Sequence, residues 1–102
     1  MSDQYEKIQE INNLDQIIHA KARLLIMSYI YVSDRADFRF LHVQTGLSWG
    51  NLSTHISKLE ETGYVTIKKK IIQKKTYTTA LITKEGKKAF EEYKERIMNI
   101  FS

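Results

Sequence analysis

Two glycines divide the middle of the chain and strongly limit how it can fold. Gly46 and Gly63 each follow a stretch in which large apolar residues recur at three- and four-residue steps, the period of one helix face. Asp37 and Ser48 stand before these stretches, where their side chains can cap a helix N-terminus. A glycine just past a helix end closes the last turn. The pattern predicts a short helix from Asp37 to Gly46, a tight turn, and a second helix from Ser48 to Thr62.

The rest of the chain predicts a hairpin and further helices around this pair. After Gly63, Val65 and Ile67 alternate with Thr66, and residues 77–82 form a second β-prone run, which predicts a two-stranded hairpin. Helical spacing extends from Tyr5 to Leu14, from Leu14 to about Val32, and again after Thr83. Residues 33–35 are polar and are interpreted as a break between helices.

In this order, the predicted elements are the parts of a winged helix-turn-helix. We therefore expect an α+β fold, mainly α, with a two- or three-stranded antiparallel wing and flanking N- and C-terminal helices. The 102 residues suffice for one domain spanning 1–102. With no proline in the sequence, helices joined by tight turns are favoured.

Charge is distributed unevenly and points to a polyanionic partner. The net charge is +4, and residues 48–79 carry six basic against two acidic side chains, so the excess lies in this segment. Such a basic patch favours nucleic acid. No glycine-rich phosphate loop, metal cluster or activated nucleophile appears, and we expect neither an enzyme nor a cofactor. Without cysteine, signal peptide or long apolar run, a cytoplasmic protein that does not enter the membrane is expected.

One face of the 48–62 helix is predicted to read DNA in the major groove. At 100° per residue, Leu52, Ile56 and Leu59 point inward, and the outer and flanking positions carry small hydrogen-bonding side chains that let the backbone approach base edges. The candidate residues are Ser48, Trp49, Gly50, Asn51, Ser53, Thr54, His55, Ser57 and Lys58. A merely solvated face is the alternative, but such faces are usually rich in Glu, Lys and Arg. Trp49 can instead pack against the protein.

The hairpin carries a cluster of lysines that we expect to contact phosphates. Five lysines fall within eight residues without an intervening acid, and the candidate contacts are Lys69, Lys70, Gln73, Lys74 and Lys75. Like charges at this density repel unless a polyanion or water screens them. Lysines that protect an edge strand from aggregation explain one or two of the five.

The segment from Leu14 to Phe90 resembles the MarR/ArsR-like winged-helix transcriptional regulators, in particular a short single-domain subgroup. The resemblance rests on Leu14–His19, Ala22–Leu24, Ala36–Phe38, Thr45–Ser48, Gly50–Ser53, His55–Glu60, Thr62–Val65 and Leu81–Gly86. It implies that residues 48–58 contact DNA, that the hairpin is the wing and that the terminal helices form a dimer. Where the family often has glycine, proline and arginine in the wing, this chain has Gln73, Thr76 and Tyr77. We therefore expect its lysines to bind phosphates with little sequence choice.

Apolar stripes on the terminal helices, about 3–13 and 84–101, predict a homodimer that reads a palindromic operator. The candidate interface residues are Tyr5, Ile8, Ile11, Phe90, Tyr93, Ile97, Ile100 and Phe101. A monomer in which the two helices cover each other is the alternative.

The sequence does not identify an effector. The three histidines, His19, His42 and His55, lack the paired spacing of metal ligands, so no metal site is expected. Tyr29, Tyr31 and Tyr93 are candidates for a pocket between dimer helices, although core packing explains them equally well. A winged-helix module that binds an acidic protein through its wing remains an alternative to DNA binding.

Overall fold

Both predicted capped helices are present in the structure, a computed structural model that describes residues 2–102. They are α3 (Phe38–Thr45) and α4 (Trp49–Thr62). The Asp37 carboxylate accepts the Arg39 amide at 2.7 Å, and the Ser48 hydroxyl accepts the Asn51 amide at 3.1 Å. Gly46 and Gly63 end the helices in the left-handed conformation, with φ of 72° and 89°. The caps therefore lie where the sequence placed them.

A three-stranded antiparallel sheet confirms the mixed fold. The strands β1 (Arg35–Asp37), β2 (Val65–Ile72) and β3 (Lys75–Ile82) lie in the order β1-β3-β2, with Val65 opposite Ile82. The predicted break over residues 33–35 is confirmed only at Asp34, because Ser33 is still helical and Arg35 already lies in a strand. Asp34 ends α2 (Lys21–Ser33) at a φ of 67°, and Arg35 already pairs with Leu81. Three residues are too short a strand to show a period.

The long helix predicted from Leu14 begins only at Lys21. Residues 14–20 form turns instead, because the Asp15 carboxylate accepts the amides of Ile17 and Ile18 at 2.8 and 3.2 Å. A side chain that binds its own neighbouring amides competes with the helical ladder. Leu14 and Ile18 are nevertheless buried. Their apolar spacing thus reflects packing of an irregular segment rather than a helix.

The core lies where α2, α3 and α4 meet the base of the sheet. The fully buried large side chains include three from α2, one from α3 and three from α4, and the residues are Ile26, Met27, Ile30, Leu41, Leu52, Ile56 and Leu59. Burying such side chains stabilises a fold by about 1.5–3 kcal/mol each. This core fixes α4 relative to the wing, formed by β2 and β3.

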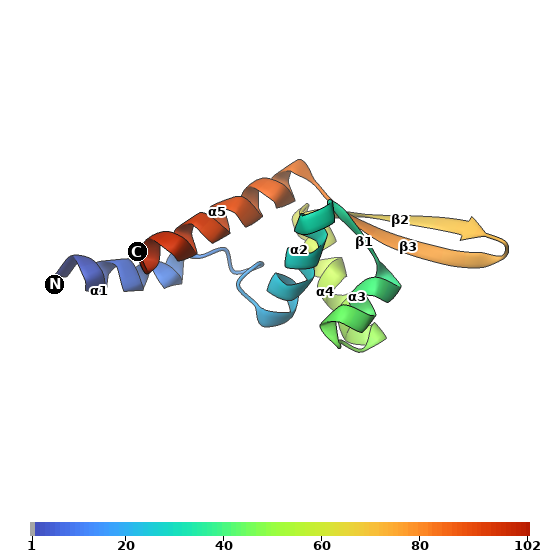
Figure 1. The fold of residues 1–102 in the computed structure, drawn as a ribbon, viewed down its shortest axis with the longest axis horizontal. Helices are drawn as coiled ribbons and strands as arrows, with labels where there is room; N and C mark the ends of the chain where they lie inside the picture. The colour runs from blue at the N-terminus through green and yellow to red at the C-terminus, as the bar shows by residue number, and fades with distance from the viewer. Residues whose placement is uncertain (1) are drawn as a thin grey trace.

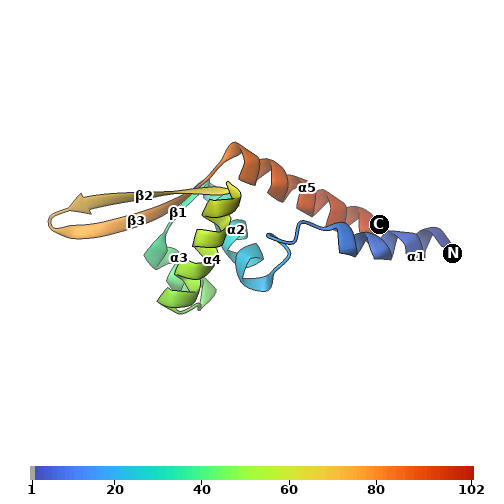
Figure 2. The ribbon, with the colours of Figure 1, turned by 180° about the vertical axis from the view of Figure 1, so that it is seen from behind.

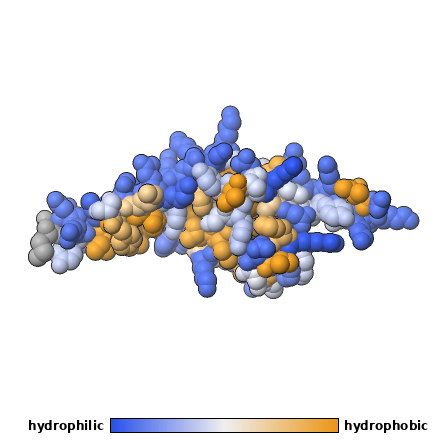
Figure 3. Space-filling model, in the orientation of Figure 1, coloured by the Kyte–Doolittle hydropathy of each residue, from blue (hydrophilic) through white to orange (hydrophobic). Residues whose placement is uncertain are grey.

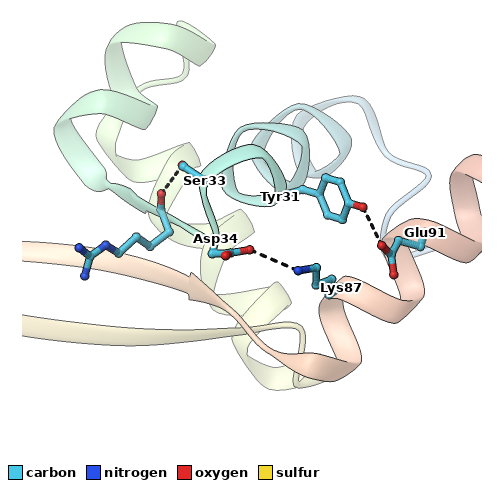
Figure 4. A network of polar contacts seen from close by, with 6 residues as sticks. Tyr31, Ser33, Asp34, Lys87 and Glu91 are labelled. Atoms are coloured by element: carbon cyan, nitrogen blue, oxygen red, sulfur yellow. Dashed lines mark hydrogen bonds and ion pairs between the residues drawn. The ribbon is translucent and has the colours of Figure 1, made fainter.

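The helix α5 (Lys84–Ile100) packs against α2. The Thr83 hydroxyl caps it by accepting the Gly86 amide at 3.0 Å. Figure 4 shows two contacts that join α5 to the end of α2: the Tyr31 hydroxyl donates to Glu91 at 2.7 Å, and Lys87 lies 3.7 Å from Asp34. The hydrogen bond to Glu91 raises the pKa of Tyr31.

The molecule is elongated, with extents of 62 × 26 × 21 Å. Figures 1 and 2 show the wing projecting at one end and the terminal helices at the other, where α1 (Ser2–Gln9) and the 3-10 turn η1 (Glu10–Asn13) meet the end of α5. Among residues 2–102, no helix is both long and apolar enough to span a bilayer.

The apolar stripe predicted to be exposed on the last helix is largely buried within the chain. Phe90, Tyr93 and Ile100 are 5–6% exposed, and Ile97 and Ile11 pack against the same core. The expected exposure is therefore wrong for Phe90, Tyr93 and Ile100. Phe90 stacks on Tyr31 of α2, Tyr93 contacts His19, and Ile100 lies beside Lys7 and Glu10. The apolar side chains that stay exposed at this end are Tyr5, Ile8, Met98 and Phe101.

Candidate nucleic-acid interface

The helix α4 presents a polar outer face while its inner face is locked into the core. Leu52, Ile56 and Leu59 are at most 1% exposed, as the helical period predicts. The exposed side comprises Ser48, Gly50, Asn51, Ser53, Thr54, Ser57 and Lys58. No atom outside the local helix lies within 4 Å of a Cβ built on Gly50. The backbone of α4 is thus open to close approach by a ligand.

The turn between α3 and α4 is held by a chain of short contacts. The Thr45 hydroxyl donates to the Leu41 carbonyl at 2.6 Å and accepts the Leu47 amide at 3.2 Å. His42 Nδ1 lies 2.8 Å from the Leu47 carbonyl. Because a carbonyl only accepts, this nitrogen carries the proton. These bonds fix the angle at which α4 leaves the turn.

Trp49 packs against the turn rather than beneath the N-terminal helix. Its ring stacks on His42 with centroids 4.0 Å apart and an interplanar angle of 11°, yet 52% of the residue stays exposed. The indole thus forms a rigid plate at the start of α4. Trp49 thus packs against the protein on His42 while about half of the residue stays exposed.

Arg23 is a residue of this site that the sequence reasoning missed. From α2, its Nε donates to the Ile17 carbonyl at 2.6 Å and its Nη1 lies 3.3 Å from His55 Nδ1. An arginine only donates, so Nδ1 of His55 accepts and Nε2 carries the proton when the ring is neutral. Arg23 and His55 are 32 positions apart, and no local pattern links them. Together they border a hollow along the outer face of α4.

The wing ends in a tight turn formed by Gln73 and Lys74. Both residues have positive φ, 50° and 66°, as a two-residue type I′ turn requires. Glycine, asparagine or aspartate usually occupies such positions, so this turn forms despite its sequence. Ile71 and Ile72 flank the turn and are 77% and 52% exposed. Figure 3 shows hydrophobic surface near this end of the wing.

The wing lysines do not form one patch. Side chains alternate between the two faces of a strand, and Ile67, Lys69 and Thr78 border a hollow that they share with Ser53 and Ser57 of α4. Lys68 and Lys70 border a second hollow that no α4 residue lines, and Lys69 reaches this one as well. Lys74 and Lys75 lie at the turn and just after it. Of the predicted contacts, Lys69 is therefore placed toward α4, Gln73, Lys74 and Lys75 lie at or next to the tip, and Lys70 lies on the other face.

The three candidate effector tyrosines lie in separate contacts. Tyr29 meets the Phe40 ring edge-on with centroids 5.7 Å apart, Tyr31 stacks on Phe90 at 4.8 Å, and the Tyr93 hydroxyl lies 2.8 Å from His19 Nδ1. They do not line a common pocket, so packing accounts for each. The three histidines likewise have different partners.

Comparison with known proteins identifies this arrangement. Residues 22–101 match the family described as the winged helix DNA-binding domain. The chain belongs to this family. A similar fold, with a TM-score of 0.79, is found in a transcriptional regulator homologue from Pyrococcus horikoshii, which is 25% identical; the match covers 94% of this chain and 91% of that one. The winged-helix chain is thus a DNA-binding regulator.

Two further similarities bear on the fold and the length. An uncharacterized protein of Methanocaldococcus jannaschii is 33% identical over 85 residues, which are 83% of this chain and 92% of that protein. NadR, solved in complex with 4-hydroxyphenylacetate, has a TM-score of 0.71 at 22% identity, with 94% of this chain and 66% of NadR covered. The likeness to NadR supports the winged-helix fold alone.

Proposed function

We propose that this winged-helix protein is a sequence-specific transcriptional regulator that places α4 in the major groove of double-stranded DNA. The observation that carries the proposal is the outer face of α4, where Asn51, Ser53 and Thr54 surround Gly50 on a helix held by buried leucines. Amide and hydroxyl groups both donate and accept hydrogen bonds, as base edges require. The Thr54 hydroxyl already donates to the Gly50 carbonyl at 2.9 Å, so it approaches a base as an acceptor.

Phosphate contacts fall to cations around this face. Lys58 stands late in α4 and borders the same hollow as Thr54, where recognition helices meet the backbone. Lys74 lies in the turn at the wing tip. We expect these two lysines to strengthen binding to every sequence, whereas Asn51 selects among sequences.

Two variants separate these roles. DNA bound by the wild type is first selected from a random duplex pool. We call the double variant Lys58→Ala, Lys74→Ala the operator-side variant. It should weaken binding to all duplexes and lower the slope of log affinity against log salt by about 2, since each phosphate contact contributes about 0.9 to that slope. Asn51→Ala should instead change which sequences are selected. Uniform loss of affinity in Asn51→Ala, with the same selected sequences, would contradict base reading by α4.

We further propose a homodimer built on the terminal helices. Every residue from Asp3 to Glu10 is exposed, and a helix this short is marginal in water unless its apolar side is covered. Tyr5, Met98 and Phe101 are 63–71% exposed, and Figure 3 shows hydrophobic surface at the end of the molecule opposite the wing. A second copy, related by a two-fold axis, covers both the exposed side of α1 and the exposed apolar residues at the end of α5. The same axis pairs two α4 helices for a palindromic site.

Sedimentation at micromolar concentration tests the dimer. The wild type should have twice the monomer mass, and Ile8→Glu together with Phe101→Glu should have the monomer mass, with helix content reduced by no more than the residues of α1. As a matched control, glutamate at Val43 and Val32, which are 72% and 84% exposed outside the terminal helices, should leave the dimer intact. A monomeric wild type would count against the interface.

A further inference from the structure

The wing has a basic face that the proposed operator contact does not use. We call it the outer wing face and define it by Arg35, Arg39, Lys68, Lys70 and Tyr77. Four of these residues border a hollow of about 420 Å³ together with Thr79 and Leu81. The guanidinium of Arg39 lies 5.8 Å from the Tyr77 ring centre. No α4 residue borders this hollow, whereas α4 contributes three serine or glutamate residues and Ile56 to the hollow on the opposite face of the ribbon.

The position of this face follows from the strand register. Lys70 is paired with Tyr77, Lys68 with Thr79, and Arg35 with Leu81, and directly paired residues point to the same side of a sheet. The intervening pair of Ile67 and Ala80 points toward the core, where Ala80 is fully buried. The alternation therefore separates Lys68 and Lys70 from α4 by the thickness of the ribbon. Figures 1 and 2 show no helix over the outer half of the wing in either view.

The charges of this face are only partly offset within the chain. Across residues 2–102, the single ion pair within 4.0 Å joins Lys87 to Asp34, and neither residue belongs to this face. Asp37 is paired with Thr79, so it lies on the same side of the sheet as Lys68, and its carboxylate caps α3 without losing its charge. Four cations against this one acid still repel one another in the free protein, and a polyanion removes that repulsion.

The chemistry of the face favours nucleic acid over an acidic protein. Stable protein interfaces bury a centre of aromatic and aliphatic anchors, but the aromatic ring here is half-buried beneath Arg39. Apart from Leu81, the other side chains that border the hollow end in ammonium, guanidinium or hydroxyl groups. Interfaces with DNA are more polar and far more positive than those with protein, and their affinity is dominated by phosphate contacts.

We propose that the outer wing face binds the sugar–phosphate backbone of a second DNA duplex while α4 holds the first. A regulator with this property links two DNA segments, or two distant parts of one. Binding at the outer wing face is independent of sequence, since the cationic ends of Arg35, Lys68 and Lys70 contact phosphates, which carry no sequence information.

The experiment captures two different duplexes on the full-length protein. A fluorescent duplex of the selected sequence is bound first, and a biotinylated duplex of unrelated sequence is then added and recovered on beads. The outer-face variant carries Lys68→Ala and Lys70→Ala, and the operator-side variant (Lys58→Ala, Lys74→Ala) removes the same charge as a matched control. Lys69 is kept in both because it borders both hollows. Circular dichroism verifies that each variant is folded.

The wild type should retain the fluorescent duplex on the beads. The outer-face variant should bind the selected duplex within about twofold of the wild type but lose about tenfold or more of the bridging, as expected when two phosphate contacts are removed at moderate salt. The operator-side variant should bind the selected duplex more weakly and still bind the biotinylated duplex. Poly-glutamate at equal charge should compete with the second duplex less well than unlabelled DNA does.

Four results would overturn the proposal. The first is a wild type that fails to bridge, and the second is an outer-face variant that loses as much affinity for the selected duplex as the operator-side variant does. The third is loss of bridging only in the operator-side variant, which assigns bridging to the two α4 helices of a dimer. The fourth is poly-glutamate that competes better than DNA, which assigns the face to an acidic protein. None of these results touches base reading by α4, which the Asn51→Ala selection tests separately.

Discussion

Replacing Gly86 by alanine should destabilise the protein, although alanine is the better helix former. Gly86 lies in the first turn of α5 and is buried. A Cβ built there would lie 2.1 Å from the Tyr64 carbonyl oxygen, 2.9 Å from its carbon and 3.0 Å from its Cα. All three atoms are backbone, and no side-chain rotation relieves the contact. The same carbonyl accepts the Thr83 amide at 3.0 Å, so the start of α5 is bonded to the residue that it would strike.

The magnitude follows from three contributions. An ordinary carbon–oxygen contact is about 3.3 Å or longer, so α5 must move by roughly 1 Å from Tyr64. Strain from overpacking costs about 1–3 kcal/mol, and weakening the hydrogen bond from Thr83 costs about 1 kcal/mol. The higher helix propensity of alanine offsets up to about 1 kcal/mol of this loss. The free energy of unfolding should therefore fall by about 1–3 kcal/mol, and Tm by about 4 °C or more.

Gly50→Ala is the matched control. Gly50 also lies in the first turn of a helix, but nothing stands within 4 Å of its Cβ position, so the same substitution should raise the free energy of unfolding by up to about 1 kcal/mol. Both variants are measured by urea unfolding at one fixed protein concentration, because a dimer's stability depends on concentration. If Gly86→Ala were as stable as the wild type or more so, the close approach of α5 to Tyr64 would be wrong.

Three further predictions concern the cap, a titrating tyrosine and Arg23. Ser48→Ala removes the side-chain acceptor of the Asn51 amide and should lower the free energy of unfolding by about 1 kcal/mol, with an unchanged urea midpoint as the contrary result. Burial, and then its hydrogen bond to Asp15, raise the pKa of Tyr64 to about 12. Since this folded-state pKa exceeds the unfolded value, the associated stability is complete below pH 10 and is lost as the pH rises toward 12. Tm is measured against pH for the wild type and Tyr64→Phe, and an equally steep fall of Tm in both proteins over this range would contradict the prediction. Arg23→Lys loses the fork that reaches Ile17 and His55 and should lower the unfolding free energy by about 1 kcal/mol, which thermal and urea unfolding can check against Lys21→Ala on the exposed side of α2.

Elements whose ends are fixed by local chemistry could be predicted from the sequence. A cap depends on a side chain and an amide two or three residues away, so Asp37, Ser48 and Thr83 determine the starts of α3, α4 and α5 regardless of the rest of the fold. The left-handed ends at Gly46 and Gly63 are local in the same way. The outer face of α4 followed directly, because a correct start and a period of 3.6 fix which residues point outward.

Elements that depend on distant partners could not be predicted in this way. Leu14 and Ile18 have helical spacing, yet Asp15 accepts the amides of Ile17 and Ile18 and also accepts a hydrogen bond from Tyr64, 49 positions away. The burial of Phe90 and Tyr93 likewise depends on α2 and residues 11–20 folding back over α5. Periodicity identifies an apolar face but does not tell whether the same chain or a second copy covers it.

The segment 14–20 also joins the two ends of the molecule. His19 contacts Tyr93 on α5, Asp15 bonds Tyr64 at the base of the wing, and the Ile17 carbonyl holds Arg23 against His55 of α4. A displacement of α1 and η1 can reach α2 and α4 through this segment, because it is the covalent link between η1 and α2. A displacement of α5 has a second route, through its own contacts with Tyr31 and Asp34.

The face of the wing on which each lysine lies could not be predicted either, for a different reason. Lys68, Lys69 and Lys70 are adjacent in the chain and belong to one lysine cluster, but consecutive residues of a strand point to opposite faces. A run of three lysines must therefore divide between the two sides of the ribbon, whichever side meets the operator. The register with Tyr77 and Thr79 decides that Lys68 and Lys70 lie on the side away from α4. Consecutive charged residues on a helix are spread around its axis, whereas on a two-stranded ribbon they alternate between two faces. The lysine run therefore creates two basic surfaces, and each of them needs its own counter-charge.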